Sequence, residues 1–471
     1  MTAPLVSVCV PAHDQAPYIA AALRSALAQD VDLEVVVQDD ASTDGTGSVV
    51  DGIADPRVRY ARHGRRLGVA ATRNACLARA RGRYVAWLDA DDEHLPGMLA
   101  RQVEALEADP GIGLAHGGFQ VMTAGGEPLA DWPAPFEGDA VEAPAVAFRH
   151  LLASNEMTTS TVVVRRECHD ATGGFRPEIG VSSTDWDAWL RIVRHNGVAY
   201  TAAPVARYRQ HKGTISSATT PGGQRLRCDI AVVRHVLRHH AAGLPDGARM
   251  SAAAHAALAT KALDHAGDLF TRGHRSGAAR AVAHASRLAP SAVSPLAPRL
   301  LRSTMRGDED ASYRTTRAIL GRLADRLEGT RYGRKVRRAA AGDPEWEAAL
   351  ERIARGLRRT LPRDANVAAV AKWDPTLLSL IEREGRNFPD RGLMPDGYPR
   401  DGAAAVEHLE QLRREGVSHL VVPSAYSWWL DHYTQLADHL EDRYRREAGS
   451  AECLVFDLRG DDARPLLTAA R

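Results

Sequence analysis

Two aspartates that follow a short apolar run are the residues best suited to chemistry in this sequence. Asp89 and Asp91 flank Ala90, directly after the run at residues 84–88. Because side chains alternate along an extended strand, both carboxylates are expected on one side of the chain. Hard oxygen ligands of this kind suit Mg²⁺ or Mn²⁺, which commonly also bind the phosphates of a substrate. The pair therefore predicts a metal-dependent site for a diphosphate ligand, unless these acids only cap the helix expected near Pro96.

The segments around this pair alternate between strand and helix patterns. Short apolar runs predict strands at residues 5–10, 33–37, 57–61, 84–88, 112–115 and 159–164. Helical spacing and capping residues predict helices at 17–29, from the capping residues near 44–46 to about 54, at 69–81 and at 185–195. This order is typical of an α/β domain with a mixed, mainly parallel sheet, whose ligand crevice lies beyond the carboxyl ends of the strands. The acidic clusters at 39–40 and 89–92 both follow such strand ends.

Several motifs in the first half of the chain carry a family resemblance. Residues 6–14 read Val-Ser-Val-Cys-Val-Pro-Ala-His-Asp, residues 84–92 read Tyr-Val-Ala-Trp-Leu-Asp-Ala-Asp-Asp, and related motifs stand at 33–46 and 68–75. In order and spacing they closely resemble the family 2 glycosyltransferases of the nucleotide-sugar-binding GT-A fold. Further matches at 158–166, 173–175, 185–191 and 208–216 extend the resemblance over about residues 5–218. The sequence lacks the Gln-x-x-Arg-Trp motif, which disfavours processive polymerisation of the cellulose or chitin type.

The resemblance implies a binding site for a nucleoside-diphosphate sugar. Its donor-binding residues are Pro11, Ala12, His13, Asp40, Gly68, Arg73, Asp89 and Ala90. Asp40 is expected to accept a hydrogen bond from the imide N–H of the base, which favours UDP or dTDP. Arg73 would lie near the diphosphate, where its fork of donors fits phosphate oxygens. Gly68 would allow close approach of the backbone.

The same resemblance implies metal ligands and a catalytic base. Asp91 would bind Mg²⁺ or Mn²⁺ directly, Asp89 would contact the ribose or the metal shell, and His211 would complete the metal site. Asp185 matches the general base that takes the proton of the acceptor hydroxyl in an inverting displacement. Relatives commonly have Glu where this chain has Thr184, and an aromatic or Asn-containing pair where it has His13 and Asp14.

These features predict an inverting, metal-dependent transfer to a hydroxyl in cell-envelope polysaccharide, glycoconjugate or natural-product synthesis. One alternative is a nucleotidyltransferase of related fold, although no glycine-rich, basic loop follows the first strand. Another is an inactive GT-A scaffold or binding protein.

The net charge of +1 provides no global attraction to nucleic acid or anionic lipid. We expect a cytoplasmic protein with reduced thiols, because the sequence has no signal sequence, no long apolar stretch and no Cys-x-x-Cys pair. It would be either free in the cytoplasm or bound at the inner face of the membrane.

The rest of the chain predicts two further parts. We expect a GT-A domain at 1–222, a helical connector at 223–358 and a small α/β accessory domain at 359–471. The spacing of seven residues suggests one degenerate tetratricopeptide-like hairpin. They are Ala262, Ala266, Leu269, Ala278, Val282, Ala285 and Pro290. This hairpin either packs on neighbouring helices or belongs to a peptide-binding array.

The connector is locally basic, and the last part contains a new set of strand patterns. Residues 299–363 contain 17 Arg and Lys against 9 Asp and Glu, which indicates either a solvated helix face or peripheral contact with a membrane or acidic partner. Strands are expected at 366–371, 419–423 and 452–456, with a helix at 402–415. Trp428 and Trp429 either stack on a sugar or pack into a core, and we favour the core.

Overall fold

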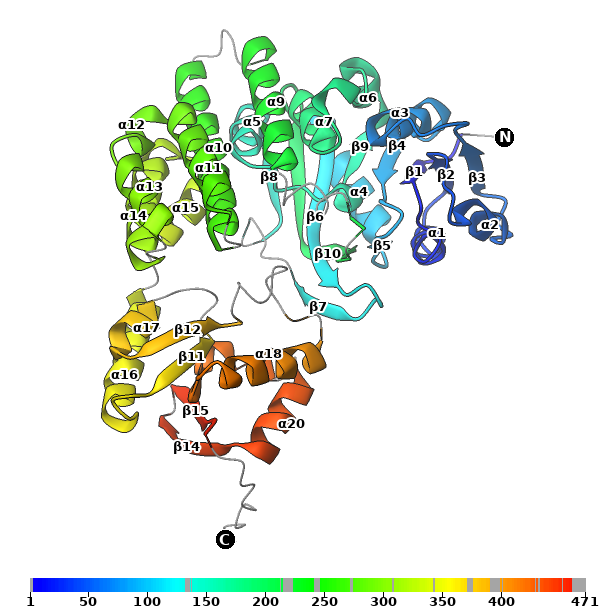
Figure 1. The fold of residues 1–471 in the computed structure, drawn as a ribbon. Helices are drawn as coiled ribbons and strands as arrows, with labels where there is room; N and C mark the ends of the chain where they lie inside the picture. Colours follow the sequence, from blue (N-terminus) through cyan, green and yellow to red (C-terminus); the bar gives the residue numbers. More distant parts are fainter. Residues whose placement is uncertain are drawn as a thin grey trace. The chain divides into compact units, whose positions relative to one another are not determined.

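The computed structural model describes most of the chain. The described residues are 3–131, 136, 138–211, 213–214, 223–240, 246–271, 274–306, 309–341, 344–370, 376–389, 399, 401–427, 429–430, 433–450 and 452–459. The chain forms two compact units, one made of residues 1–258 and 326–334, and the other of residues 259–325 and 335–471. Figure 1 shows the elements of both units along the sequence.

A mixed sheet forms the centre of the first unit. Its strands, in the order in which they are hydrogen-bonded, are β3 (Val58–Arg62), β2 (Leu33–Asp39), β1 (Val6–Ala12), β4 (Tyr84–Trp87), β9 (Val163–Arg165), β6 (Ile112–Met122), β10 (Gly197–Arg209) and β5 (Glu93–His94). Two short strands pair with parts of longer strands: β7 (Pro128–Asp131) pairs with β6, and β8 (Ala140–Glu142) pairs with β10. The pairs β3–β2, β2–β1, β1–β4 and β6–β10 are parallel, whereas β9 is antiparallel to both of its neighbours. The predicted mixed, mainly parallel sheet is confirmed.

Helices cover both faces of this sheet (Figure 1). The helices of the first unit are α1 (Ile19–Leu27), α2 (Thr46–Asp51), α3 (Val69–Arg79), α4 (Met98–Glu107), α5 (Pro144–Ala153), α6 (Arg166–Thr172), α7 (Thr184–Val193) and α9 (Gln224–His239). Alternate residues of the strands, such as Val8 and Val35, pack with Leu23 of α1 and Leu99 of α4 in one core. On the other face, Cys76 of α3 lies against β2. The buried strands therefore read as continuous apolar runs, as expected for a sheet covered on both sides.

Three of the predicted strand limits are wrong. The strand expected at 112–115 extends to Met122 as β6. Pro11 was expected to end the first strand, but β1 continues to Ala12. The pairing of β1 with β4 stops at Cys9, so no neighbouring strand needs a hydrogen bond from the proline nitrogen on that side. The strand expected at 159–164 begins only at Val163, because residues 159–161 form a 3-10 turn.

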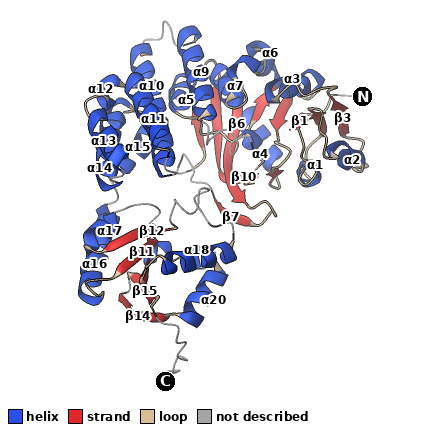
Figure 2. Ribbon diagram, in the orientation of Figure 1, coloured by secondary structure: helices blue, strands red, loops and turns tan. Residues whose placement is uncertain are grey.

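Helices dominate the middle of the chain, as predicted for the connector at 223–358 (Figure 2). They are α10 (Gly247–Thr271), α11 (Arg275–Leu288), α12 (Pro290–Val293), α13 (Ala297–Arg306), α14 (Glu309–Arg326), α15 (Arg331–Ala341) and α16 (Pro344–Thr360). The apolar positions of the predicted hairpin fall on α10 and α11, where Ala262, Ala266 and Val282 are buried. No helix in the described part of the chain is both long and apolar enough to cross a membrane.

The compact units do not coincide with the predicted domain limits of 222 and 358. Helix α9 packs on α7 in the first unit, and the segment 326–334 also belongs to that unit. Arg331 holds this segment there, because its guanidinium lies 2.6 Å from Glu142 of β8 and 2.6 Å from Glu156. These three side chains are largely buried, so their charges depend on one another.

A separate five-stranded sheet lies in the second unit, as the strand patterns predicted. Its order is β12 (Glu384–Phe388), β11 (Asn366–Val370), β13 (His419–Pro423), β15 (Cys453–Asp457) and β14 (Arg445–Ser450). The helices α17 (Thr376–Ile381), α18 (Gly402–Arg414) and α20 (Thr434–Arg443) complete it. Trp429 is buried with Phe388 and Tyr433 in the core on one face, as expected, and Trp428 lies outside the described residues.

Candidate functional site

The loops that follow β2 and β3 meet at Asp40. The Asp40 carboxylate is buried and accepts the backbone N–H groups of Leu67, at 2.7 Å, and Gly68, at 2.8 Å. Gly68 has a φ of 90°, a conformation that favours glycine, and it begins α3. Asp40 thus fixes the loop before α3, and each of its oxygens keeps a lone pair for a further donor.

His13 connects the loop after β1 to the same residue. Its Nδ1 lies 2.9 Å from the backbone carbonyl oxygen of Asp40, and its Nε2 lies 3.4 Å from Asp14. Asp14 in turn accepts the backbone N–H of Thr43 at 2.7 Å. Pro11 and Ala12 immediately precede His13 at the end of β1, so the five predicted donor-binding residues Pro11, Ala12, His13, Asp40 and Gly68 come together at one edge of the sheet.

A second cluster is built around Arg73 of α3. Its guanidinium is 3.1 Å from the Asp89 carboxylate and 5.5 Å from the centre of the Phe175 ring. Arg73 is nearly buried, whereas about a third (32%) of the Asp89 side chain is exposed. Partial burial raises the pKa of Asp89, and the nearby carboxylates of Asp91 and Asp185 add to this effect, while Arg73 opposes it. Arg73 and Asp89 therefore form a charged pair that remains accessible on the carboxylate side.

Asp91 and His211 form the predicted metal pair. Ala90, which separates Asp91 from Asp89, is buried. The Asp91 Oδ2 and the His211 Nε2 lie 2.9 Å apart, although the residues are 120 positions apart in the sequence. Neighbouring ligands of an octahedral cation with bonds of about 2.0–2.1 Å lie about 2.9 Å apart, so the two atoms fit one Mg²⁺ or Mn²⁺. The backbone N–H of Gly213 donates to His211 Nδ1 at 3.2 Å, so in this structure Nε2 carries the ring proton and donates it to Asp91 Oδ2.

Asp92 has a supporting role that the sequence did not reveal. This buried carboxylate accepts the Ser160 hydroxyl at 2.6 Å and the backbone N–H of Arg209 at 2.9 Å. Burial raises the pKa of Asp92 well above its ordinary value, and repulsion from Asp91 and Asp89 acts in the same direction. Asp92 thereby joins the end of β4, the turn before β9 and the end of β10 next to the partly buried Asp89 and Asp91.

Arg209 and Tyr18 also escaped the sequence analysis. The Arg209 Nε donates to the backbone oxygen of Asp91 at 2.8 Å, and its guanidinium lies 5.1 Å from the centre of the Tyr18 ring. The Tyr18 and His211 rings are 4.7 Å apart. Arg209 belongs to the motif at 208–216, which was a signal for its importance, whereas no pattern marked Tyr18.

Asp185 lies in the first turn of α7 and is linked to the Arg73 cluster through a shared hydroxyl. Thr159 Oγ1 lies 3.2 Å from Asp185 Oδ2 and 3.4 Å from Arg73 Nη2. The hydroxyl therefore donates to the Asp185 carboxylate and accepts from the Arg73 guanidinium. Thr184, where relatives commonly have Glu, lies 3.5 Å from Arg73 through its hydroxyl. The predicted base and the predicted diphosphate ligand are therefore parts of one hydrogen-bonded group.

The turn before α7 is held by a residue outside the predicted GT-A domain. Ser183 has a φ of 64°, a left-handed conformation that costs about 1–2 kcal/mol for a residue other than glycine. Its hydroxyl donates to Asp229 of α9 at 2.6 Å, across 46 positions of sequence. We infer that Asp229 positions Asp185 through Ser183.

Replacing this acceptor should impair turnover more than donor binding. We expect Asp229→Ala to lower kcat by about 10- to 100-fold with little change in the donor KM, because α7 would present Asp185 less accurately. Asp229→Asn keeps an acceptor oxygen and should restore most of the rate. Steady-state kinetics of both variants measure this, and equal losses in the two, or parallel changes in kcat and KM, would contradict a positioning role.

Comparisons with known proteins identify the family of this site. The sequence model described as glycosyl transferase family 2 matches residues 7–130. A Bacillus subtilis protein named as a teichuronic acid biosynthesis glycosyltransferase, TuaG, is 30% identical over 219 residues, which cover 45% of this chain and 82% of TuaG. The succinoglycan biosynthesis protein ExoO of Rhizobium meliloti is 42% identical over 127 residues, which are 27% of this chain and only 36% of ExoO. Among solved structures, S. aureus TarS 1–349 in complex with UDP-GlcNAc matches with a TM-score of 0.50 and 17% identity, over 67% of this chain and 90% of that one.

The fold and the site thus define a sugar-transferring α/β protein with a GT-A domain. The chain belongs to family 2 of the glycosyltransferases.

Proposed function

We propose that this protein transfers a sugar from a UDP- or dTDP-sugar to an acceptor hydroxyl, with inversion at the sugar carbon. The observation that carries the proposal is the hydrogen-bonded group of Asp89, Arg73 and Asp185 around Thr159. It offers a cation for a diphosphate and a carboxylate for a hydroxyl proton within the same site. The neighbouring pair of Asp91 and His211 adds a place for a divalent cation.

Each residue of the candidate site has a defined part in the proposed reaction. Asp40 binds the base through its remaining lone pairs, while Gly68 and the loop after β1 leave room for the nucleoside. Arg73 binds the diphosphate, and Asp185 removes the proton of the acceptor hydroxyl as the new bond to the sugar forms. Asp91 and His211 would hold Mg²⁺ or Mn²⁺, which when bound supplies positive charge for the leaving diphosphate.

The names of the relatives favour a role in the cell envelope. ExoO is named for succinoglycan biosynthesis and TuaG for teichuronic acid biosynthesis, both of which are polysaccharides. We therefore propose a glycan or a lipid-linked glycan as the acceptor, and action in the cytoplasm at the inner face of the membrane. We also propose a catalytic part at 1–222, a connector at 223–358 and an accessory domain at 359–471, with α9 of the connector packed on α7 of the catalytic part.

Nucleotide binding provides the direct test of this function. We expect UDP with Mn²⁺ to raise the melting temperature of the protein, because a ligand that binds only the folded state stabilises it by about 2.7 kcal/mol at 100 times its Kd. UDP without the cation should give a smaller shift, and GDP and ADP should give less still if Asp40 reads the imide of uracil. A thermal-shift screen measures all of these. The absence of a shift with every nucleotide and nucleotide sugar would favour an inactive scaffold, and release of pyrophosphate from a nucleoside triphosphate would favour a nucleotidyltransferase.

The basic helices offer a contact with the membrane on which such acceptors reside. Arg299, Arg302 and Arg306 recur on one face of α13, are all exposed, and lie near the exposed Met305. We propose that this face binds anionic phospholipid, to which each arginine contributes about 1 kcal/mol.

Vesicle flotation distinguishes this contact from a simply solvated helix. The protein should float with phosphatidylglycerol vesicles at low salt and remain unbound with neutral phosphatidylcholine vesicles. Arg302→Gln combined with Arg306→Gln should weaken binding about 10- to 30-fold. Equal binding by the parent and the double variant would show that α13 is not the contact.

A further inference from the structure

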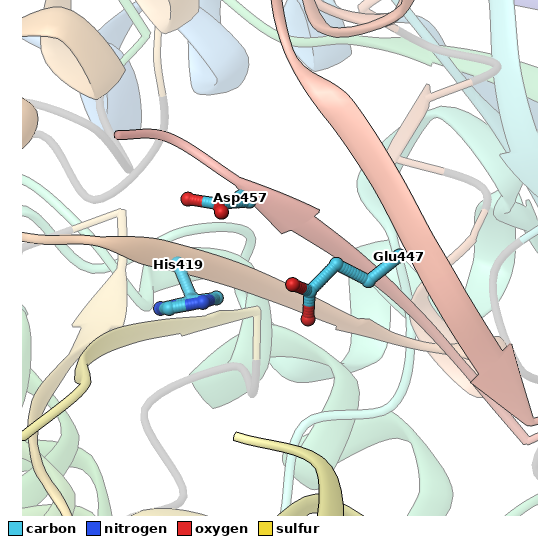
Figure 3. Close-up of side chains that lie close together, drawn as sticks. All are labelled: His419, Glu447 and Asp457. Carbon is cyan, nitrogen blue, oxygen red and sulfur yellow. The ribbon is translucent and has the colours of Figure 1, made fainter. Parts of the chain in front are cut away.

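Three potential metal ligands lie together on one face of the C-terminal sheet, far in sequence from the proposed active site. His419 of β13 and Asp457 of β15 are directly opposite each other in an antiparallel pair. Glu447 of β14 pairs with Val455, two residues before Asp457, so its side chain is on the same face. Figure 3 shows the imidazole ring and both carboxylates turned toward one another. One ligand atom from each residue lies within 4.8 Å of the others.

The imidazole of His419 is buried and has one nitrogen without a partner. The residue is 0% exposed, and Nε2 makes no hydrogen bond to any described residue. Its Nδ1 lies 2.9 Å from the Ser418 hydroxyl, which also lies 3.1 Å from the backbone oxygen of Asn366. When the hydroxyl donates its one proton to the Asn366 oxygen, Nδ1 carries the imidazole proton and donates it to Ser418. The lone pair of His419 is then on Nε2, the form in which histidine binds metals.

The charges around this nitrogen favour a cation. Burial lowers the pKa of His419, so the ring is neutral at neutral pH, although Asp457, Glu447 and Asp364 act in the opposite direction. Three carboxylates thus act on a neutral imidazole, and two arginines stand near them: Arg459, and Arg445, which is directly opposite Asp457 in the pair of β14 and β15. The Arg459 guanidinium binds Asp457 through Nε at 2.9 Å and Nη2 at 2.8 Å, and this contact lowers the pKa of Asp457.

Simple packing accounts poorly for this arrangement. A buried nitrogen without a hydrogen bond costs about 1–3 kcal/mol, and an apolar side chain at position 419 would avoid that cost. Half of the Arg459 side chain is exposed, so the guanidinium is free to turn toward solvent when another cation takes its place. Glu447 is partly exposed, and its flexible side chain allows the carboxylate to approach by about 1 Å, as metal bonds of about 2.0–2.2 Å require.

We propose that His419, Glu447 and Asp457 bind a transition-metal dication of the Zn²⁺ type, which fastens β13, β14 and β15 together. One imidazole and two carboxylates form a mixed nitrogen and oxygen set, which suits Zn²⁺ better than Mg²⁺. The site is independent of the pair formed by Asp91 and His211, and its role is structural because it links three strands.

The test uses the full chain with Asp91→Ala and His211→Ala, so that the proposed donor site contributes no metal. Equilibrium dialysis against Zn²⁺ should give one bound equivalent per chain. Glu447→Gln should weaken Zn²⁺ binding at least about tenfold, since one charged ligand is lost. His419→Gln should change the visible absorption spectrum of bound Co²⁺, because the nitrogen ligand is lost. Because His419 is buried, circular dichroism must show that this variant folds.

Arg459 provides the sharper comparison, because its loss should strengthen the site. Arg459→Gln removes the competing cation from Asp457 and should tighten Zn²⁺ binding several-fold. The matched control is Arg446→Gln, since Arg446 is exposed and pairs with Phe456, on the opposite face of the sheet. No bound Zn²⁺ in the parent, or equal Zn²⁺ affinity in the parent, the Glu447→Gln variant and the Arg459→Gln variant, would overturn the proposal whatever the outcome at the donor site.

Discussion

Asp185→Asn should lower the rate of sugar transfer by about 10²- to 10⁴-fold, the usual contribution of a general base, while donor affinity stays at the parental level. The amide has the same shape and can keep the hydrogen bond from Thr159, which lies 3.2 Å from Asp185 Oδ2. It cannot accept the proton of the acceptor hydroxyl. Turnover should therefore fall without a loss of folding or of the Arg73 cluster. Initial rates with saturating donor and calorimetric titration with UDP measure the two quantities separately.

A matched control and the stereochemistry of the product make this prediction sharp. Asp170 is an exposed acid on α6, so Asp170→Asn should transfer sugar at the parental rate. The anomeric configuration of the product, read by nuclear magnetic resonance, should be opposite to that of the donor. Parental turnover in the Asp185→Asn variant would show that Asp185 is not the base. A product with the same anomeric configuration as the donor would exclude a single-displacement mechanism.

Asp91→Ala should abolish the part of donor binding that depends on the cation. The substitution removes one of two ligand atoms that lie 2.9 Å apart and leaves His211 without its carboxylate. A cation between protein and diphosphate supplies several kcal/mol, so UDP affinity in Mn²⁺ should fall about 100-fold or more. Turnover should fall with it. Titration of UDP in Mn²⁺ and in a chelator, with the parent and the variant, measures the difference.

The parent in chelator should resemble the Asp91→Ala variant in Mn²⁺. Glu104 is an exposed acid on α4, so Glu104→Gln should leave UDP binding unchanged and serves as the control. If the Asp91→Ala variant still bound UDP more tightly in Mn²⁺ than in chelator, the ligand assignment would fail. If the parent itself showed no dependence on the cation, the proposed donor chemistry would have to proceed without one.

Much of the first unit could be predicted because its signals are local. The apolar runs that became β1, β2 and β4 are short and continuous, and each is followed by acidic or turn-forming residues. Parallel strands place their carboxyl ends at one edge, so the acids at 39–40 and 89–92 were expected at that same edge. The position of Asp40 against Gly68 also follows from the motifs, since both lie at loops of that edge.

The supporting contacts could not be predicted, because they join residues far apart in sequence. Asp92 meets Arg209 across 117 positions, and Ser183 meets Asp229 across 46, with Asp229 beyond the predicted limit of the domain. The turn at 159–161 was mistaken for strand because Thr and Val favour extended structure locally. Only the insertion of β9 between β4 and β6 fixes where Thr159 and Ser160 must lie.

The sequence by itself determined the family, the alternation of strands and helices from β1 to β4, and the types of residue at the acidic edge of the first sheet. These depend on local patterns and on motifs at set spacing. The tertiary structure alone decided which carboxylates are exposed and which are buried, that Arg73 and Asp185 share Thr159, and that His419, Glu447 and Asp457 face one another. Burial and long-range contact set the charge and availability of a side chain, and neither is a property of its neighbours in sequence.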